Sequence, residues 1–254
     1  MSIRLVRRCM FVSLALAGLL ATPCFAHRND FERTYPLQPG GTFELQNVNG
    51  TVEVQGWDRP EVEIRATKTA KTSRSDLDRV HIDVNARPDA ISVVTQYPQD
   101  EGVEVAVDYT IRLPHTARVE HIGTINGTLR ISGVDTLRDL HTVNGNIEVY
   151  DGGGTVRART TNGDVYLELA RFRSTDEANA ETTNGSLQLA VPSDTQAQLE
   201  ALSLNGEFRT ELPMVLESSL VPREVRGKLG NGGGSIRLRT VNGGIRVVTL
   251  RSSV

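Results

Sequence analysis

The chain has 254 residues, of which 38% are hydrophobic and 23% are charged, and its formal net charge is −3. A chain of this length can bury a sizeable core, and its acidic balance excludes a general nucleic-acid binder, which needs a basic surface. Both cysteines, Cys9 and Cys24, lie near the N-terminus, so the rest of the chain can form neither a disulfide nor a thiolate metal site.

Residues 1–26 are typical of a secretory signal peptide. Three arginines precede an apolar run over residues 10–21, and Ala26 is a small residue suited to cleavage. We expect cleavage after Ala26 and export, with the mature protein periplasmic, associated with the cell envelope or secreted. Because the segment carries three arginines and no carboxylate, cleavage changes the net charge from −3 to −6.

Two alternatives concern the same segment. An uncleaved anchor would need about 20 apolar residues, which is longer than this run. A lipoprotein would be cut before Cys24, but Pro23 stands where a small residue is usual, and lipidation of Cys24 stays open. No second apolar stretch approaches membrane length, so no transmembrane segment is expected after signal removal.

Residues 27–120 are predicted to form an N-terminal β region that leads into or caps the repeats. Val62 and Ile64 indicate a short strand, and apolar residues alternate without a break from Val103 to Leu113. The segment 73–80 fits a turn or one short helix. The end of a stack of coils needs a cap, because its last coil exposes unpaired backbone groups.

Residues 121–254 are organised by a repeated phrase, and they belong to the same single domain. The phrase is Thr or Ser, an apolar residue or Thr, Asn, Gly, any residue, and an apolar residue, as in Thr124–Leu129, with an earlier relative at Asn47–Val52. We interpret its Asn-Gly pairs as structural corners: Asn49, Gly50, Asn126, Gly127, Asn144, Gly145, Asn162, Gly163, Asn184, Gly185, Asn205, Gly206, Asn242 and Gly243.

The spacing of the phrase indicates stacked units. From Asn126 to Asn205 the asparagines are separated by 18, 18, 22 and 21 residues. The next gap, from 205 to 242, is 37 residues, and it contains two prolines and no Asn-Gly. We therefore expect one period plus an excursion rather than two periods with a marker missing. Residues 152–163 and 232–243 also match over twelve positions, at an offset of 80 or about four periods.

Two all-β architectures fit this pattern. Apolar residues between the markers alternate by twos, and Asn-Gly suits a tight corner. In a hairpin meander each Asn-Gly would join antiparallel strands. In a β-solenoid, which is β-helix-like, each period of about 18–22 residues is one coil, and like residues stack about 4.8 Å apart. Near-identical phrases favour the solenoid. In that fold we expect Gly145, Gly163 and Gly185 to be at positive φ, and we expect position 164, which varies among the repeats, to tolerate substitution of Asp164.

Three phrases, Asn47–Asp58, Glu61–Ile64 and Val107–Pro114, together with the Thr-x-Asn-Gly repeats, resemble those of a known family. It comprises exported, adhesin-like β-strand-repeat proteins of unknown function, and the resemblance covers roughly residues 38–250. It implies a β-solenoid-like fold, export to the cell envelope and no established enzymatic activity. It carries no catalytic residues to transfer.

No catalytic, cofactor or metal site is predicted. The five histidines lack a metal-ligand spacing, and no Gly-x-Ser-x-Gly phrase occurs. Segments 151–154 and 162–164 faintly resemble calcium repeats, but the residue after Asn-Gly varies too much to form a ladder of ligands. The repeated Asn and Thr suit a binding row, although hydrogen bonding from coil to coil explains them better.

Five outward arginines are a candidate stripe for an anionic ligand, because the guanidinium suits phosphate and carboxylate. They are Arg157, Arg159, Arg237, Arg239 and Arg246. The favoured interpretation is a charged, solvated sheet face, and Glu148 and Glu168 on similar outward positions would interrupt the stripe.

These observations predict an exported, non-catalytic cell-envelope β-repeat protein with a binding, adhesin-like or scaffolding role. Its partner, an envelope glycan, a lipid or a protein, is not identified by the sequence. The alternative is a polysaccharide-acting β-helix enzyme, a lyase or glycosidase, which would need acidic pairs on neighbouring coils.

Overall fold

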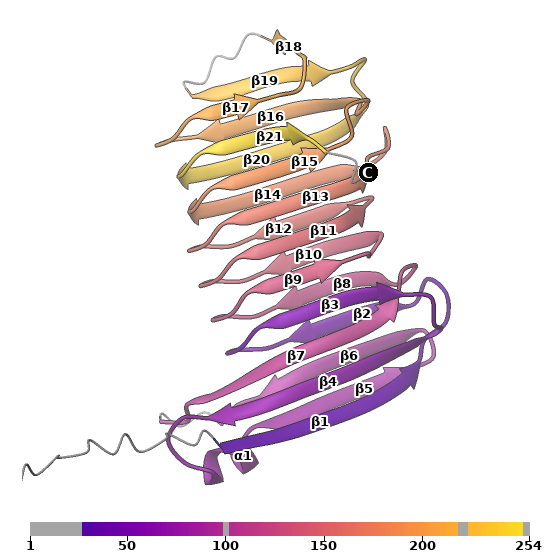
Figure 1. Cartoon of the computed structure of the whole chain (residues 1–254), viewed down its shortest axis with the longest axis vertical. Helices are drawn as coiled ribbons and strands as arrows, with labels where there is room; N and C mark the ends of the chain where they lie inside the picture. The colour runs from indigo at the N-terminus through magenta and orange to yellow at the C-terminus, as the bar shows by residue number, and fades with distance from the viewer. Residues whose placement is uncertain (1–26, 99–101, 218–222, 251–254) are drawn as a thin grey trace, which may run out of the picture.

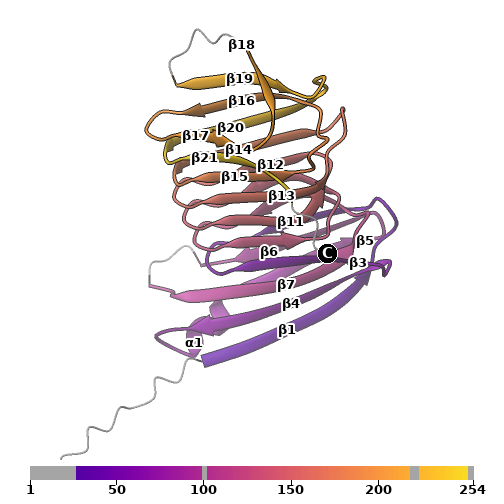
Figure 2. The same ribbon diagram turned by 45° about the horizontal axis from the view of Figure 1, so that its top comes forward.

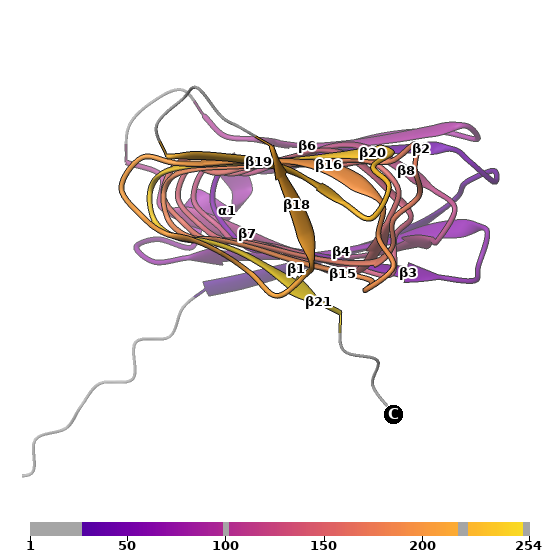
Figure 3. The same cartoon turned by 90° about the horizontal axis from the view of Figure 1, so that it is seen from above.

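The computed structural model describes residues 27–98, 102–217 and 223–250, which form two long β-sheets and one short helix. The strands lie one above another in Figure 1, and the view along the stack in Figure 3 shows the two sheets as facing layers. The predicted signal peptide over residues 1–26 lies outside the described residues. No helix in the described part of the chain has the length and apolar character needed to cross a bilayer.

We name the sheets A and B. In spatial order, sheet A contains β1 (His27–Pro36), β4 (Glu61–Ala70), β7 (Val105–Pro114), β3 (Val52–Trp57), β9 (Leu129–Ser132), β11 (Ile147–Gly153), β13 (Val165–Arg171), β15 (Leu187–Val191), β21 (Ile245–Thr249) and β17 (Phe208–Thr210). Sheet B contains β18 (Met214–Glu217), β19 (Glu224–Leu229), β16 (Ala197–Ser203), β20 (Gly234–Asn242), β14 (Glu177–Asn184), β12 (Val156–Arg159), β10 (Thr136–His141), β8 (Arg118–Gly123), β2 (Thr42–Gln46), β6 (Ala90–Gln96) and β5 (His81–Arg87).

Equivalent strands of successive periods pair in parallel. In sheet A, Ile147 of β11 lies beside Leu129 of β9 on one side and Val165 of β13 on the other. In sheet B, β8, β10, β12 and β14 are parallel in the same way. Each period is therefore one coil with a strand in each sheet. The predicted all-β solenoid is confirmed, and the hairpin meander is wrong, because a meander needs antiparallel neighbours.

The core fills the space between the sheets as one continuous cluster of apolar side chains. Alternate residues of each strand point inward, as in β13, where Val165, Leu167 and Leu169 are each at most 1% exposed. The two-residue period of the sequence therefore marks the inner face correctly. Parallel stacking superposes apolar residues of successive coils, which removes them from water along the whole stack.

Antiparallel strands and a short helix lie at the N-terminal end of the stack, and antiparallel strands extend sheet B at the other end (Figure 1). At the N-terminal end, β1 and β4 pair antiparallel next to β7, and β5 pairs antiparallel with β6. The segment expected to be a turn or short helix forms α1 (Ser75–Arg79). At the other end, β19 pairs antiparallel with β16 and β18. These strands cover edges that would otherwise expose unpaired backbone groups.

The region proposed as residues 27–120 contributes coils as well as the cap. Its strands β2 and β3 pair in parallel with β8 and β9 of the repeat region. The proposed boundary at residue 120 falls inside β8, so the two regions are continuous in both sheets.

At both ends, the order of coils in space differs from their order in the chain (Figure 2). The first coil, β2–β3, lies between the β6–β7 coil and the β8–β9 coil, as Figure 1 shows. The last coil, β20–β21, lies between the β14–β15 coil and the β16–β17 coil. The first and last coils are thus each inserted one coil inside the parallel stack, and the β6–β7 and β16–β17 coils lie outside them.

This insertion explains the long gap between the last two asparagine markers. Between them the chain forms β18 and β19, which pair antiparallel with each other, so the predicted excursion is confirmed. The chain then returns and inserts β20 beside β14 and β16. The strands β12 and β20 belong to the two matching twelve-residue segments, which are four periods apart in sequence. Because of the insertion, they lie on either side of β14.

A buried polar cluster lies where the N-terminal cap meets the first coils. The hydroxyls of Tyr109 and Thr95 are 2.7 Å apart, and the Tyr97 hydroxyl lies 3.3 Å from the Asn49 carbonyl oxygen and 3.2 Å from that of Val105. Burial raises the pKa of Tyr97 to about 12 and the pKa of Tyr109 further, because the apolar surroundings disfavour a phenolate. Both phenols are therefore neutral and available to hydrogen-bond in the folded protein.

Candidate functional site

The repeated asparagines form one continuous ladder at the corners where the chain passes from sheet B to sheet A. In each step, a side-chain amide nitrogen donates to the neighbouring side-chain oxygen at 2.8 or 2.9 Å. The spatial order is Asn49, Asn126, Asn144, Asn162, Asn184, Asn242 and Asn205. The ladder runs through all seven corners and follows the inserted order of the coils.

In six of the seven phrases a buried Thr or Ser stands three residues before the glycine and bonds to the adjacent coil, and Asn47 takes this place before Gly50. The Thr182 hydroxyl donates to the carbonyl oxygen of Gly163 at 2.9 Å, and Thr160 donates to Gly145 at the same distance. Ser203 makes the equivalent bond to Gly243 at 2.8 Å. Both polar positions of the phrase are thus engaged in holding neighbouring coils together.

Close approach of backbone requires glycine at every corner, and a positive φ adds to this requirement at some of them. The predicted positive φ is confirmed at Gly145 and Gly163, with φ of 159° and 156°, whereas Gly185 is not at positive φ, so the expectation for Gly185 is wrong. A Cβ on Gly185 would overlap the carbonyl oxygen of Gly163, and a Cβ on Gly163 would overlap that of Gly145. The exposed residue Asp164 is also engaged, because its carboxylate accepts from the Ser186 amide at 2.7 Å.

The solenoid does not unite the five candidate arginines. Arg157 and Arg159 lie on β12 and Arg237 and Arg239 on β20, all in sheet B, whereas Arg246 lies on β21 in sheet A.

In sheet B the intervening strand β14 supplies carboxylates to the arginines. Arg159 pairs with Glu181 at 3.0 Å, and Arg237 pairs with Glu177 at 3.4 Å. Arg239 pairs at 2.7 Å with Glu200 of β16, and this hydrogen bond raises the pKa of the guanidinium. Three of the four candidate arginines in sheet B are therefore neutralised by neighbouring strands.

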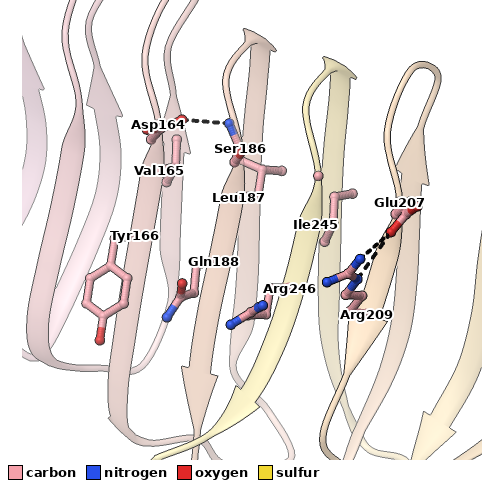
Figure 4. A pocket seen from close by; sticks show the side chains of 11 residues that line it. Asp164, Val165, Tyr166, Ser186, Leu187, Gln188, Glu207, Arg209, Ile245 and Arg246 are labelled. Atoms are coloured by element: carbon pink, nitrogen blue, oxygen red, sulfur yellow. Dashed lines mark hydrogen bonds and ion pairs between the residues drawn. The ribbon is translucent and has the colours of Figure 1, made fainter.

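Arg246 lies in a different setting, on the outer face of sheet A (Figure 4). It borders a shallow hollow of about 500 Å³, with Tyr166 of β13 and Gln188 of β15. Gln188 lies in register with Tyr166 on one side and with Arg246 on the other. Among the residues the structure describes, no carboxylate pairs with Arg246; the neighbouring Arg209 is held by Glu207 at 2.6 Å.

A second hollow, of about 270 Å³, continues from the first along the strands. Tyr166, Gln188 and Arg246 line both hollows, and Glu168 and Thr249 lie in the second. These three side chains therefore form the centre of one elongated groove across β13, β15 and β21. We call this surface the sheet A groove.

Aromatic side chains flank the groove. The rings of Tyr150 and Tyr166 lie 5.3 Å apart at 44°. The Tyr166 hydroxyl donates to Glu168 at 2.9 Å, and the Tyr150 hydroxyl donates to Glu148 at 3.2 Å. Partial burial, followed by the hydrogen bond to Glu168, raises the pKa of Tyr166 to about 12. The two rings therefore lie next to each other on the sheet surface, each held by a hydrogen bond to a carboxylate of its own strand.

Sequence reasoning identified Arg246 but missed Tyr166 and Gln188. Aligning the copies would have found them, because each stands four residues after a marker asparagine. The same position in the other copies holds Glu53, Arg130, Glu148, Arg209 and Arg246. Parallel stacking places all seven in one row on the outer face of sheet A.

No group of three or more metal-ligating side chains gathers within the described ranges. Four carboxylates line the two hollows of the groove: Asp164, Glu168, Glu207 and Glu211. Three of them accept hydrogen bonds: Asp164 from the Ser186 amide, Glu207 from Arg209 and Glu168 from Tyr166. The arrangement offers an aromatic face, an amide and a guanidinium, which are groups that bind and orient a polar ligand.

The family described as Toastrack DUF4097 matches residues 36–248. No curated protein matches the sequence. Among solved structures, a putative cell adhesion protein from Clostridium sporogenes is 13% identical, with 87% of this chain and 100% of that chain covered and a TM-score of 0.52. A putative adhesin from Bacteroides fragilis is 12% identical, with 87% and 97% covered and a TM-score of 0.38. At 13% identity, the Clostridium structure indicates a shared fold.

Proposed function

Because the chain belongs to the Toastrack DUF4097 family and has its solenoid fold, we propose that it is an exported, non-catalytic binding protein of the cell envelope. Its binding surface is the sheet A groove, and its ligand is an extended glycan that carries acidic groups. The observation that carries the proposal is the row Tyr166, Gln188 and Arg246, which lies at the meeting point of two hollows.

Each member of the row supplies a different interaction. The Tyr166 ring offers an apolar face for a sugar ring, and the Gln188 amide both donates and accepts hydrogen bonds. The guanidinium of Arg246 can hold a carboxylate through two parallel hydrogen bonds. Because the three stand on paired strands about 4.8 Å apart, the surface is preformed and loses little entropy on binding.

Export follows from residues 1–26 and is tested separately. We expect the protein recovered from the periplasm or medium to begin at His27, because cleavage after Ala26 fits the small-residue rule. Intact-mass spectrometry measures this directly. A start at Cys24 with added acyl mass would show that the protein is a lipid-anchored lipoprotein. An uncut chain would contradict export by this route.

Binding is tested with polygalacturonate as the acidic probe and dextran as the neutral one. We expect saturable binding of polygalacturonate that Arg246→Ala weakens by about 10-fold or more, since a hydrogen bond to a charged group contributes about 1.5–3 kcal/mol. Tyr166→Ala should weaken it as well, whereas Tyr166→Phe, which keeps the ring, should weaken it less. Calorimetric titration of each variant measures these differences.

Arg157→Ala is the matched control. Arg157 is exposed on sheet B and, like Arg246, has no ion-pair partner in the described part of the chain. If Arg157→Ala and Arg246→Ala weakened binding equally, the groove would not be the binding site, and the arginines of sheet B would become the candidates. Release of reducing ends or unsaturated sugars during the titration would contradict the non-catalytic role in favour of the glycosidase or lyase.

A further inference from the structure

Another polar hollow, of about 540 Å³ and outside the sheet A groove, lies at the opposite corners of the coils, where the chain passes from sheet A to sheet B. Four arginines line it: Arg118, Arg138, Arg171 and Arg173. None of them belongs to the repeated phrase or to the candidate stripe. We propose that this arginine hollow binds a phosphate- or sulfate-class oxyanion carried by a larger molecule.

The four arginines outnumber the carboxylates that form ion pairs with them. Glu120 is shared by Arg118, at 3.8 Å, and Arg138, at 3.3 Å. Arg171 pairs with Asp135 across two coils. A carboxylate shared in this way leaves N–H groups of both guanidiniums available to another acceptor.

Arg173 is the unpaired member of the set. No carboxylate among the described residues pairs with its side chain, and its backbone amide donates to Asp176 at 2.8 Å. Asp176 is 8% exposed, so this bond fixes the loop between β13 and β14 from inside. The loop therefore holds Arg173 at the rim of the hollow without neutralising it.

Hydroxyl groups add donors between the arginines. Thr136 lies in register with Arg118 on the neighbouring strand, and Thr116 and Thr155 also line the hollow. Several guanidiniums and hydroxyls around one space provide more donors than the two oxygens of a carboxylate can accept. A group with three or four oxygens, a phosphate or a sulfate, matches this donor set better.

The size of the hollow indicates that the oxyanion is a substituent on a larger molecule. Its volume of about 540 Å³ is within the range of sites for whole small molecules. The hollow is also separate from the sheet A groove, because the two share no lining residue. It therefore constitutes a second site, independent of the proposed glycan surface.

The test is calorimetric titration of the full mature chain with inorganic phosphate and with sulfate at about 0.15 M salt, where surface charges are screened beyond about 8 Å. We expect saturable binding that Arg173→Ala weakens by about 10-fold and that the double change Arg138→Ala and Arg173→Ala abolishes. Arg157→Ala and Arg246→Ala should bind as the parent does. Urea midpoints of all variants establish that each is folded.

Vesicles distinguish the two sources of the oxyanion. Sedimentation with phosphatidate vesicles but not with phosphatidylcholine vesicles, lost in Arg173→Ala, supports the proposal and assigns a lipid headgroup. Binding of phosphate or sulfate without vesicle binding supports it and assigns a soluble or glycan-borne group. Absence of binding in every arm, or equal weakening by Arg157→Ala, overturns the proposal.

Discussion

Replacing Gly185 with alanine is expected to lower the free energy of unfolding by about 3 kcal/mol, the upper end of the usual cost of overpacking. The added Cβ would overlap the carbonyl oxygen of Gly163 on the preceding coil. The same oxygen accepts the hydroxyl of the buried Thr182 at 2.9 Å. The overlap can therefore be relieved only if the two coils separate or this hydrogen bond breaks. Either change displaces backbone as well as one side chain.

Gly244→Ala is the matched control for this change. A Cβ on Gly244 has its nearest neighbour, the Glu207 carbonyl oxygen, at an ordinary contact distance of 3.5 Å. Both substitutions restrict the unfolded chain alike, and since neither glycine is at positive φ, alanine strains the folded backbone at neither. Urea denaturation of the two variants measures the difference. Equal midpoints would show that the corner glycines are not needed for stacking.

Ending the chain at Gly230 is expected to unfold the C-terminal end of the stack. The truncation removes β20 and β21, which lie between the β14–β15 coil and the β16–β17 coil. It also removes four core side chains that are at most 1% exposed: Ile236, Leu238, Ile245 and Val247. At about 1.5–3 kcal/mol for each buried side chain, the loss is about 6–12 kcal/mol, which is comparable with the stability of a whole domain.

Hydrogen exchange read by mass spectrometry locates the effect. Amides of β16 and β19 should exchange rapidly in the truncated chain, because β16 loses its parallel neighbour. Amides of β11 should stay protected, since each coil of a solenoid depends mainly on adjacent coils. A chain ending at Leu250 is the control. Full protection of β16 after truncation at Gly230 would contradict the inserted position of the last coil.

The sequence by itself determined the shape of a single coil. Alternation by twos, as at Val165 and Leu167, marked the inner face, and the Asn-Gly phrases marked the turn from one sheet to the other. Their repetition predicted parallel stacking, because like residues can pack and hydrogen-bond on like only in that arrangement. The prolines in the long gap predicted the excursion in the same way.

The tertiary structure alone decided which coil lies next to which. Coils with the same phrase present similar edges, so the repeat does not distinguish a neighbour in the chain from an inserted one. The position of Asn242 between Asn184 and Asn205 therefore could not be predicted from the spacing. The candidate site depended on the same order, because the partners of an outward side chain come from adjacent coils. Glu181 and Glu200 neutralise Arg159 and Arg239, whereas insertion of β21 next to β15 places Arg246 beside Gln188 and makes the groove.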